Sequence, residues 1–183
     1  MDVTAMATAS AARGSQQYLV FSLCGETYAI DIRSIKEIIE YSRLTEVPMM
    51  PALVRGVIEL RGAVVPVLDL AVRFGRAPTQ IGRRSCIVIV ELAARPGETR
   101  VIGVIVDAVN EVLDISAEDI EPPPWFGARL RSEFIAGMGK VAGKLIILLS
   151  ATQVLALEEL AEVAAIAGGA ESGAVTQDAV CVG

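Results

Sequence analysis

The stretch RGVIELRGAVVPVLDL, from Arg55 to Leu70, decides the fold class. It consists mostly of valine, isoleucine and leucine, as expected for a pair of buried strands. The step Arg61-Gly62 lies between the two apolar runs, and glycine tolerates the positive φ that a tight hairpin turn requires. We therefore predict two strands joined at this step.

The same stretch contains charged residues that a buried hairpin does not need: Arg55, Glu59 and Arg61. Residues two apart on a strand share a face, so Glu59 and Arg61 should point away from the apolar core. An arginine on a rigid strand offers a planar fork to a carboxylate, and nearby Gly56 leaves room for a close approach to the backbone. This pattern suits the docking of a partner's helix. A solvated hairpin with weak surface salt bridges is the alternative, and the residues alone leave both open.

Further strand-like runs flank this stretch. The segment Gln17–Ile32 predicts a hairpin that turns at Gly25-Glu26, and Phe134–Leu149 predicts another. Pro66 places its own strand at a sheet edge or a bulge, because proline lacks the N–H that pairing needs. The isoleucines within 33–39 recur at helical spacing and predict a short helix or turn.

The second half of the chain continues in the same way. Ser85–Leu92 and Thr99–Ile115 predict strands, and the serines at 116 and 150 open patterns like capping boxes. The first would start one helical turn ending near residue 120, and the second a helix rich in alanine and leucine ending near 166. Short strands separated by turns every 8–12 residues indicate a mostly β fold of sandwich or barrel type.

Composition excludes several classes of protein. The chain has 183 residues, of which 53% are hydrophobic, but no apolar run approaches the roughly 18 residues of a membrane span. Direct membrane insertion is therefore not expected. The N-terminus lacks the basic region of a secretory signal. We expect residues 1–15 to be a disordered leader and 167–183 a disordered tail.

Residue types that support catalysis or metal binding are scarce. The chain has no histidine, which removes Ser-His-Asp and Cys-His catalysis and the HExxH metal site. Phosphate-binding glycine loops are also absent from the sequence. Its three cysteines, without CxxC spacing, indicate neither a disulfide framework nor a zinc site: Cys24, Cys86 and Cys181. No metal or cofactor is expected. The first two are expected to be small core residues, and a reducing cytoplasm is the expected compartment.

The charge argues against nucleic acid as a partner. The net charge is −6 and aromatic residues make up 4% of the chain, whereas single-stranded nucleic acid is bound by basic grooves with stacking rings. The charge is also uneven, since 33–84 is mostly basic and 91–121 mostly acidic. Either this is ordinary solvated surface, or two faces serve different partners.

From Tyr18 to about Leu160 the chain resembles the CheW-like family, the coupling proteins of bacterial chemotaxis arrays. The residues that carry the resemblance occur in this order: YLVFSLCGETYAIDI, IKEII, VPMMPALVRGVIELRGAVVPVLDLAVRFG, GVIVDAVNEV, PP, IAGMG and LIILL. Two positions depart from the family pattern. Glu59 stands where the family commonly has Asn, which puts a charge beside the docking arginine. Ser150 stands where the family often has Asp, and both are good N-caps.

The resemblance implies a mostly β fold of two five-stranded β-barrels, Src-homology-3-like or OB-like, packed on a shared core with short helices and a C-terminal helix. Residues 16–166 would then form a single domain. The first barrel would take residues from about 16 to 66 together with the segment 144–166, and the second barrel residues from about 67 to 143.

The resemblance also implies a function. The protein would be a non-enzymatic adaptor that couples chemoreceptors, the methyl-accepting chemotaxis proteins, to the histidine kinase CheA. It would lie in the cytoplasm at membrane-bound receptor clusters. Its partners would be the receptor's cytoplasmic tip and the kinase's regulatory domain, with other CheW-like domains in array rings as a further candidate.

Specific positions follow from the same resemblance. Gly25 and Gly62 would be structural turn residues, and no kinase-contact residue is assigned. We expect Arg61 to be exposed and within reach of Glu37, an acid that the helical spacing of 33–39 places on a helical turn. The receptor groove would be formed by these residues: Ile35, Glu37, Gly56, Leu60, Arg61 and Val64.

Other functions remain to be weighed. A CheA kinase would need a phosphorylatable histidine, and a CheV-type protein an added receiver domain, so a stand-alone coupling protein is expected. A small β-barrel module that binds a ligand without a signalling role is the alternative. A third hypothesis is an enzyme that uses the paired carboxylates Asp107 and Glu111, although these are read more simply as surface acids at strand ends.

Overall fold

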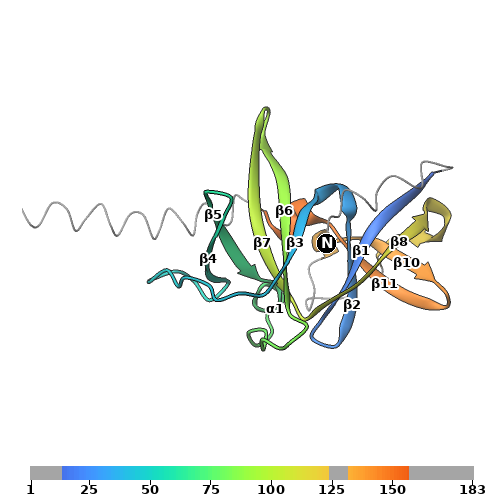
Figure 1. Ribbon diagram of the computed structural model, residues 1–183. Helices are drawn as coiled ribbons and strands as arrows, with labels where there is room; N and C mark the ends of the chain where they lie inside the picture. The colour runs from blue at the N-terminus through green and yellow to red at the C-terminus, as the bar shows by residue number, and fades with distance from the viewer. Residues whose placement is uncertain (1–13, 124–131, 157–183) are drawn as a thin grey trace, which may run out of the picture.

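Two curled sheets make up most of the protein in this computed structural model, which describes residues 14–123 and 132–156 (Figure 1). The first sheet contains, in spatial order, β8 (Ala108–Ser116), β1 (Ser15–Leu23), β2 (Glu26–Asp31), β11 (Lys144–Leu149), β10 (Ile135–Val141) and β9 (Ile120–Glu121). The second contains β3 (Ile35–Glu40), β6 (Cys86–Arg95), β7 (Glu98–Val106), β5 (Ala63–Asp69) and β4 (Val54–Leu60).

The helices are short. Two single-turn α-helices occur in the described residues, α1 (Leu70–Arg73) and α2 (Ala151–Val154). Within the same residues, three 3-10 turns lie between strands: η2 (Ile32–Ser34), η3 (Ala117–Asp119) and η4 (Ser132–Phe134). The mostly β fold predicted from the sequence is confirmed. Residues 1–13 of the expected leader, the expected tail, and the expected helix from residue 157 onward lie outside the described residues, whereas Ser15 already begins β1.

Strand pairing over long sequence distances determines which strands share a sheet. β1 pairs with β8, with Tyr18 opposite Leu113, and β2 pairs in parallel with β11, with Ala29 opposite Leu148. The sheets therefore differ from the division into barrels at 16–66 and 67–143. β3 and β4 come from the expected first barrel, yet they lie in the same sheet as β6 and β7. Only the segment 144–149 joins the N-terminal strands as expected.

The second sheet curls until its two edges meet. Beyond β3 the chain extends to Thr45, which exchanges two backbone hydrogen bonds with Val57 of β4, at 3.0 and 2.9 Å. Gly56 allows this approach, because its φ is +155° and a Cβ there would lie 2.6 Å from the Thr45 carbonyl oxygen. The enclosed space is filled by buried side chains: Leu44, Ile58, Val65, Val67, Ile87, Ile89 and Ile105.

The first sheet curls in the same way around its own apolar interior. Gly139 of β10 lies against Ile115 of β8, so close that a Cβ at Gly139 would be 3.2 Å from the Ile115 side chain. The interior residues are Tyr18, Val20, Ala29, Ile115, Ile146 and Leu148.

A larger core lies between the two sheets. Phe21 and Tyr28 of the first sheet belong to the same buried group as Val88 and Val104 of the second. The guanidinium of Arg73 in α1 adds a polar link, donating to the carbonyl of Val154 in α2 at 3.0 Å. The shared core expected from the sequence is therefore present.

Three hairpins turn in two residues that both have positive φ, which matches the right-handed twist of the strands. The turns are Cys24-Gly25, Arg61-Gly62 and Ala142-Gly143. The hairpins predicted around 17–32, 55–70 and 134–149 are confirmed, although the first turns one residue earlier than expected. Figure 1 also shows the β6–β7 hairpin extending beyond the rest of the second sheet.

The short helix or turn predicted within 33–39 is present only as a turn at the start of this segment. Only Ile32–Ser34 form a 3-10 turn, which Asp31 caps by accepting from the Arg33 N–H at 2.9 Å. From Ile35 the chain is strand β3, with Ile38 opposite Val88 of β6. Isoleucine is β-branched and fits a strand well, and pairing with β6 overrides the helical spacing.

Pro66 does not lie at a sheet edge, because β5 pairs with β4 on one side and β7 on the other. Because Pro66 has no N–H, it cannot donate a backbone hydrogen bond, but no hydrogen bond to β4 is lost. Val57, which faces Pro66, directs its own N–H and C=O to Thr45 instead. The parallel pairing with β7 begins only at Val67. The proline therefore occupies a position between the two ladders where no hydrogen bond is lost.

The two capping boxes are only partly correct. Ser116 precedes a single helical turn, η3, as predicted, whereas α2 after Ser150 ends at Val154 and does not continue as the predicted longer helix. Neither serine side chain makes a capping hydrogen bond. The Ser150 hydroxyl lies 3.2 Å from the Thr152 hydroxyl instead.

We predict that Gly56→Ala destabilises the protein more than Gly62→Ala does. Both glycines have positive φ, but a Cβ at Gly62 meets nothing within 4 Å. Gly62→Ala should therefore cost only the left-handed strain, about 1 kcal/mol. Gly56→Ala adds the clash with Thr45 and should cost about 3 kcal/mol. Urea unfolding followed by circular dichroism measures both, and equal losses would show that the Thr45–Val57 contact does not constrain the sheet.

Candidate functional site

The β4–β5 hairpin presents one apolar face inward and a mixed face outward. Ile58 and Val65 are buried inside the second sheet, and Leu60 packs against them. The alternation predicted for the strands therefore holds, and Glu59 is exposed. Arg61 differs from the prediction, because it is the first turn residue, with φ of 52°, rather than a strand residue.

The turn is fastened to β3 by an ion pair. The Arg61 guanidinium donates to the Glu37 carboxylate at 3.0 Å, with 77% of the Arg61 side chain exposed and 19% of the Glu37 side chain. This confirms that Arg61 is exposed and within reach of Glu37, which lies on a strand and not on the expected helical turn. The second carboxylate oxygen of Glu37 is buried and has no hydrogen-bond partner among the described residues.

The other predicted groove residues occupy different depths. Val64 is 71% exposed and lies opposite Glu59, whereas Leu60 is half-buried. Ile35 is buried in the core between the sheets, and Gly56 is buried against Thr45. The structure thus brings Glu37 and Arg61 into contact, places Val64 on the outer face of the same hairpin, and puts Ile35 and Gly56 beneath the surface.

Arg55 has a different partner from Arg61. Its guanidinium donates at 3.0 Å to Asp69, whose side chain is completely buried. The Asp69 carboxylate also accepts from the Ala71 N–H at 3.0 Å, and from the N–H and hydroxyl of Thr79, each at 2.8 Å. One carboxylate therefore connects β4, the first turn of α1 and the loop before β6.

Sequence reasoning missed this role of Asp69. The available signal was an aspartate directly before a short apolar segment, which is the pattern of an N-cap. The pairing with Arg55, fourteen positions away, had no such signal, because it depends on the register of the hairpin.

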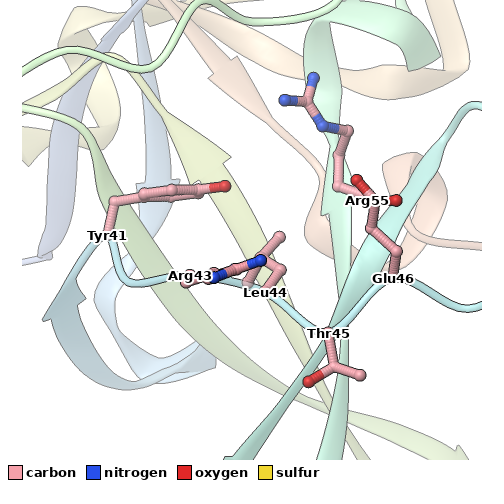
Figure 2. A pocket seen from close by; sticks show the side chains of 6 residues that line it. All are labelled: Tyr41, Arg43, Leu44, Thr45, Glu46 and Arg55. Carbon is pink, nitrogen blue, oxygen red and sulfur yellow. The ribbon is translucent and has the colours of Figure 1, made fainter.

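A surface pocket of about 570 Å³ lies at the base of β4. Figure 2 shows Tyr41 and Arg43 on one side and Arg55 and Glu46 on the other. Leu44 and Thr45 complete the lining. The lining offers hydrogen-bond donors and one carboxylate but no nucleophile with an adjacent base, so its chemistry suits recognition.

The two acids of the enzyme hypothesis do not form a pair. Asp107 accepts from the Cys24 N–H at 2.8 Å, in a link between β1 and the end of β7. Glu111 lies four positions further along the chain, exposed on β8 and opposite Val20. Extended backbone separates such residues by about 13 Å, too far for two carboxylates to act on one bond.

Among the remaining chemistry-bearing groups, Cys24 and Asp107 line one surface pocket together with Arg76. In residues 14–123 and 132–156 no three or more His, Cys, Asp and Glu residues come together as metal ligands. Burial raises the pKa of the Cys24 and Cys86 thiols, so both stay protonated at neutral pH. Both pack against the shared core, while Cys181 lies outside the described residues. None of the helices in the described part has the length and hydropathy of a membrane span.

Comparison with known proteins gives consistent results. The family described as CheW-like domain matches residues 17–159. The chemotaxis protein CheW of Klebsiella aerogenes is 34% identical over 146 residues, which is 80% of this chain and 85% of the relative. The chemotaxis protein CheW of Rhizobium meliloti is 31% identical over 146 residues, which is 80% of this chain and 91% of the relative. The crystal structure of the scaffolding protein TtCheW from Thermoanaerobacter tengcongensis is similar with a TM-score of 0.66 and 36% identity, covering 75% of this chain and 85% of that one.

We predict that Asp69→Asn destabilises the protein more than Thr79→Val does. The amide would place N–H groups against the donors that now surround the buried carboxylate, at a cost of about 3 kcal/mol. Thr79→Val removes a single hydroxyl donor, which should cost about 1 kcal/mol. Thermal and urea unfolding of the two variants give the comparison. If Asp69→Asn were as stable as the wild type, the carboxylate would not organise the three segments.

Proposed function

Because the chain belongs to the CheW-like domain family, we propose that it is a non-enzymatic adaptor that couples chemoreceptors to the histidine kinase CheA in chemosensory signalling. The family match spans nearly all of the described residues, so the role is assigned to the whole fold. The relatives are named as chemotaxis and scaffolding proteins, which supports a role in joining other proteins.

The Arg61–Glu37 pair carries this proposal. A hairpin tip with a long exposed side chain is ordinarily mobile, and ordering it on binding costs free energy. Here the pair holds the tip to β3 at 3.0 Å before any partner arrives. A surface prepared in this way suits the docking of a receptor's helical tip, and the hairpin carries no catalytic group.

The proposed receptor site has an outer and an inner part. Arg61 and Val64 contact the receptor directly, with Glu37 and Leu60 at its margin. Ile35 and Gly56 act from beneath, where they hold β3 and β4 in place. The kinase regulatory domain binds a different surface, as do other CheW-like domains, and the adaptor works in the cytoplasm at receptor clusters.

The alternative of a small ligand-binding barrel is disfavoured by packing. The interior of the second sheet is filled, since a Cβ added at Gly103 would already lie 2.9 Å from Ile87 and 3.1 Å from Val67. The interior of the first sheet is likewise occupied by buried side chains. A ligand would need space that close packing removes.

We predict that Arg61→Glu abolishes receptor binding and leaves the fold intact. The pair is mostly exposed on the Arg61 side, and exposed pairs contribute about 0–1 kcal/mol to stability. The new carboxylate would face Glu37 and release the hairpin tip. The released tip would have to be ordered again on binding, and a total cost of about 3 kcal/mol would weaken binding by roughly a hundredfold. Pull-downs against the receptor tip and the kinase regulatory domain, each alone, measure this.

Arg84→Glu is the matched control, because Arg84 is an exposed arginine outside the hairpin with the same charge change. It should bind both partners as the wild type does, and circular dichroism should show all three proteins folded. Loss of both partners by Arg61→Glu, or its unfolding, would make Arg61 a structural residue and overturn the assignment of the receptor site.

A further inference from the structure

The unpaired charge on the β4–β5 hairpin is negative. Arg61 is paired with Glu37 at 3.0 Å, and Arg55 is paired with Asp69 at 3.0 Å. Both arginines that the sequence offered to a partner's carboxylate are thus engaged within the chain. Glu59 is exposed and makes no ion pair with any residue that the structure describes.

Glu59 has a large apolar neighbour directly beside it. Val64 faces it across the hairpin and is 71% exposed. Val57, two residues before Glu59, directs its N–H and C=O away from β5 to Thr45. By the alternation of an antiparallel pair, Glu59 and Val64 are also opposed without mutual backbone hydrogen bonds, the arrangement in which facing side chains lie closest.

The spacing of this pair matches a helix. Cβ atoms of directly opposed strand residues are about 4.5–5.5 Å apart, and residues three or four apart on a helix are about 5–6 Å apart. A helix that presents a lysine or arginine one turn from an apolar residue can therefore place the cation at Glu59 and the apolar side chain on Val64.

We propose that Glu59 selects the adaptor's receptor, by pairing with a lysine or arginine that the receptor helix presents one turn from an apolar residue seated on Val64. This deepens the proposed function, on which it rests, by naming the chemistry of the partner at the same site. The sequence had suggested that an arginine of this chain pairs with a carboxylate of the partner. In this proposal the charges are exchanged, because the partner brings the cation and the adaptor supplies the carboxylate.

Charge complementarity explains why one carboxylate discriminates here. A cation beside Glu59 gains an attraction that no residue in the described part of the chain already satisfies, whereas a carboxylate there is repelled. The Glu59→Asn variant would lose both the attraction and the repulsion, and it would bind receptors that present either a cation or a carboxylate at this point. The family pattern commonly has Asn at this position, so this chain should be more selective than a relative with Asn there.

The test uses the full chain and a soluble fragment of a chemoreceptor tip from the same organism, with binding measured by isothermal titration calorimetry at low and high salt. Glu59→Lys should weaken binding by about tenfold or more, Glu59→Asn by less, and both should reduce the salt dependence. Changing the basic residue of the receptor fragment to glutamate should weaken binding to the wild type and restore binding to Glu59→Lys.

Glu118→Lys is the control, because Glu118 is an exposed acid in η3, on the side of the first sheet, and carries the same charge change. The inference is overturned if Glu59→Lys binds as tightly as the wild type, or if Glu118→Lys loses as much affinity. Failure of the proposed function gives a different result: the wild-type chain would not bind the receptor fragment, and Arg61→Glu would change nothing. The proposal about Glu59 would then be wrong as well.

Discussion

The buried carboxylate of Asp69 is the interaction on which the arrangement of the second sheet depends. It accepts from Arg55, from the backbone of Ala71 and from Thr79. A buried charge is tolerated only when it is paired and fully hydrogen-bonded, so the three segments that supply these donors must stay together. The carboxylate thereby fixes where β4 begins, where β5 ends and how the following loop returns to the sheet.

The hairpin that results is fixed at both ends. Arg55–Asp69 holds its base, and Arg61–Glu37 holds its tip against β3, while Gly56 lets Thr45 close the sheet between them. A rigid surface loses little entropy on binding, which suits the proposed adaptor role. The positions of Asp107 and Glu111 fit this proposal, because Asp107 accepts from the Cys24 backbone while Glu111 lies exposed on β8 opposite Val20, so the two acids do not form a pair.

Sequence patterns predicted the local structure better than the pairing. The hairpin at 55–70 followed from its apolar runs and Gly62, and the Arg61–Glu37 contact was anticipated. For Ile35–Glu40 the spacing of the isoleucines at 35, 38 and 39 predicted a short helix or turn, and only the pairing with β6 makes this segment a strand. The partners of β2 and β8, and the four hydrogen bonds of Asp69, depend on contacts between distant segments, which no local pattern records.

The central claim, that this protein joins receptor to kinase without catalysing a reaction, is tested most directly by reconstitution. Phosphate incorporation into purified kinase CheA is measured with and without receptor-bearing membranes, and with and without this chain. The account predicts that the chain changes the kinase rate only when receptors are present, and that it sediments with them. A change in the rate without receptors, or no change when all three are combined, would contradict it.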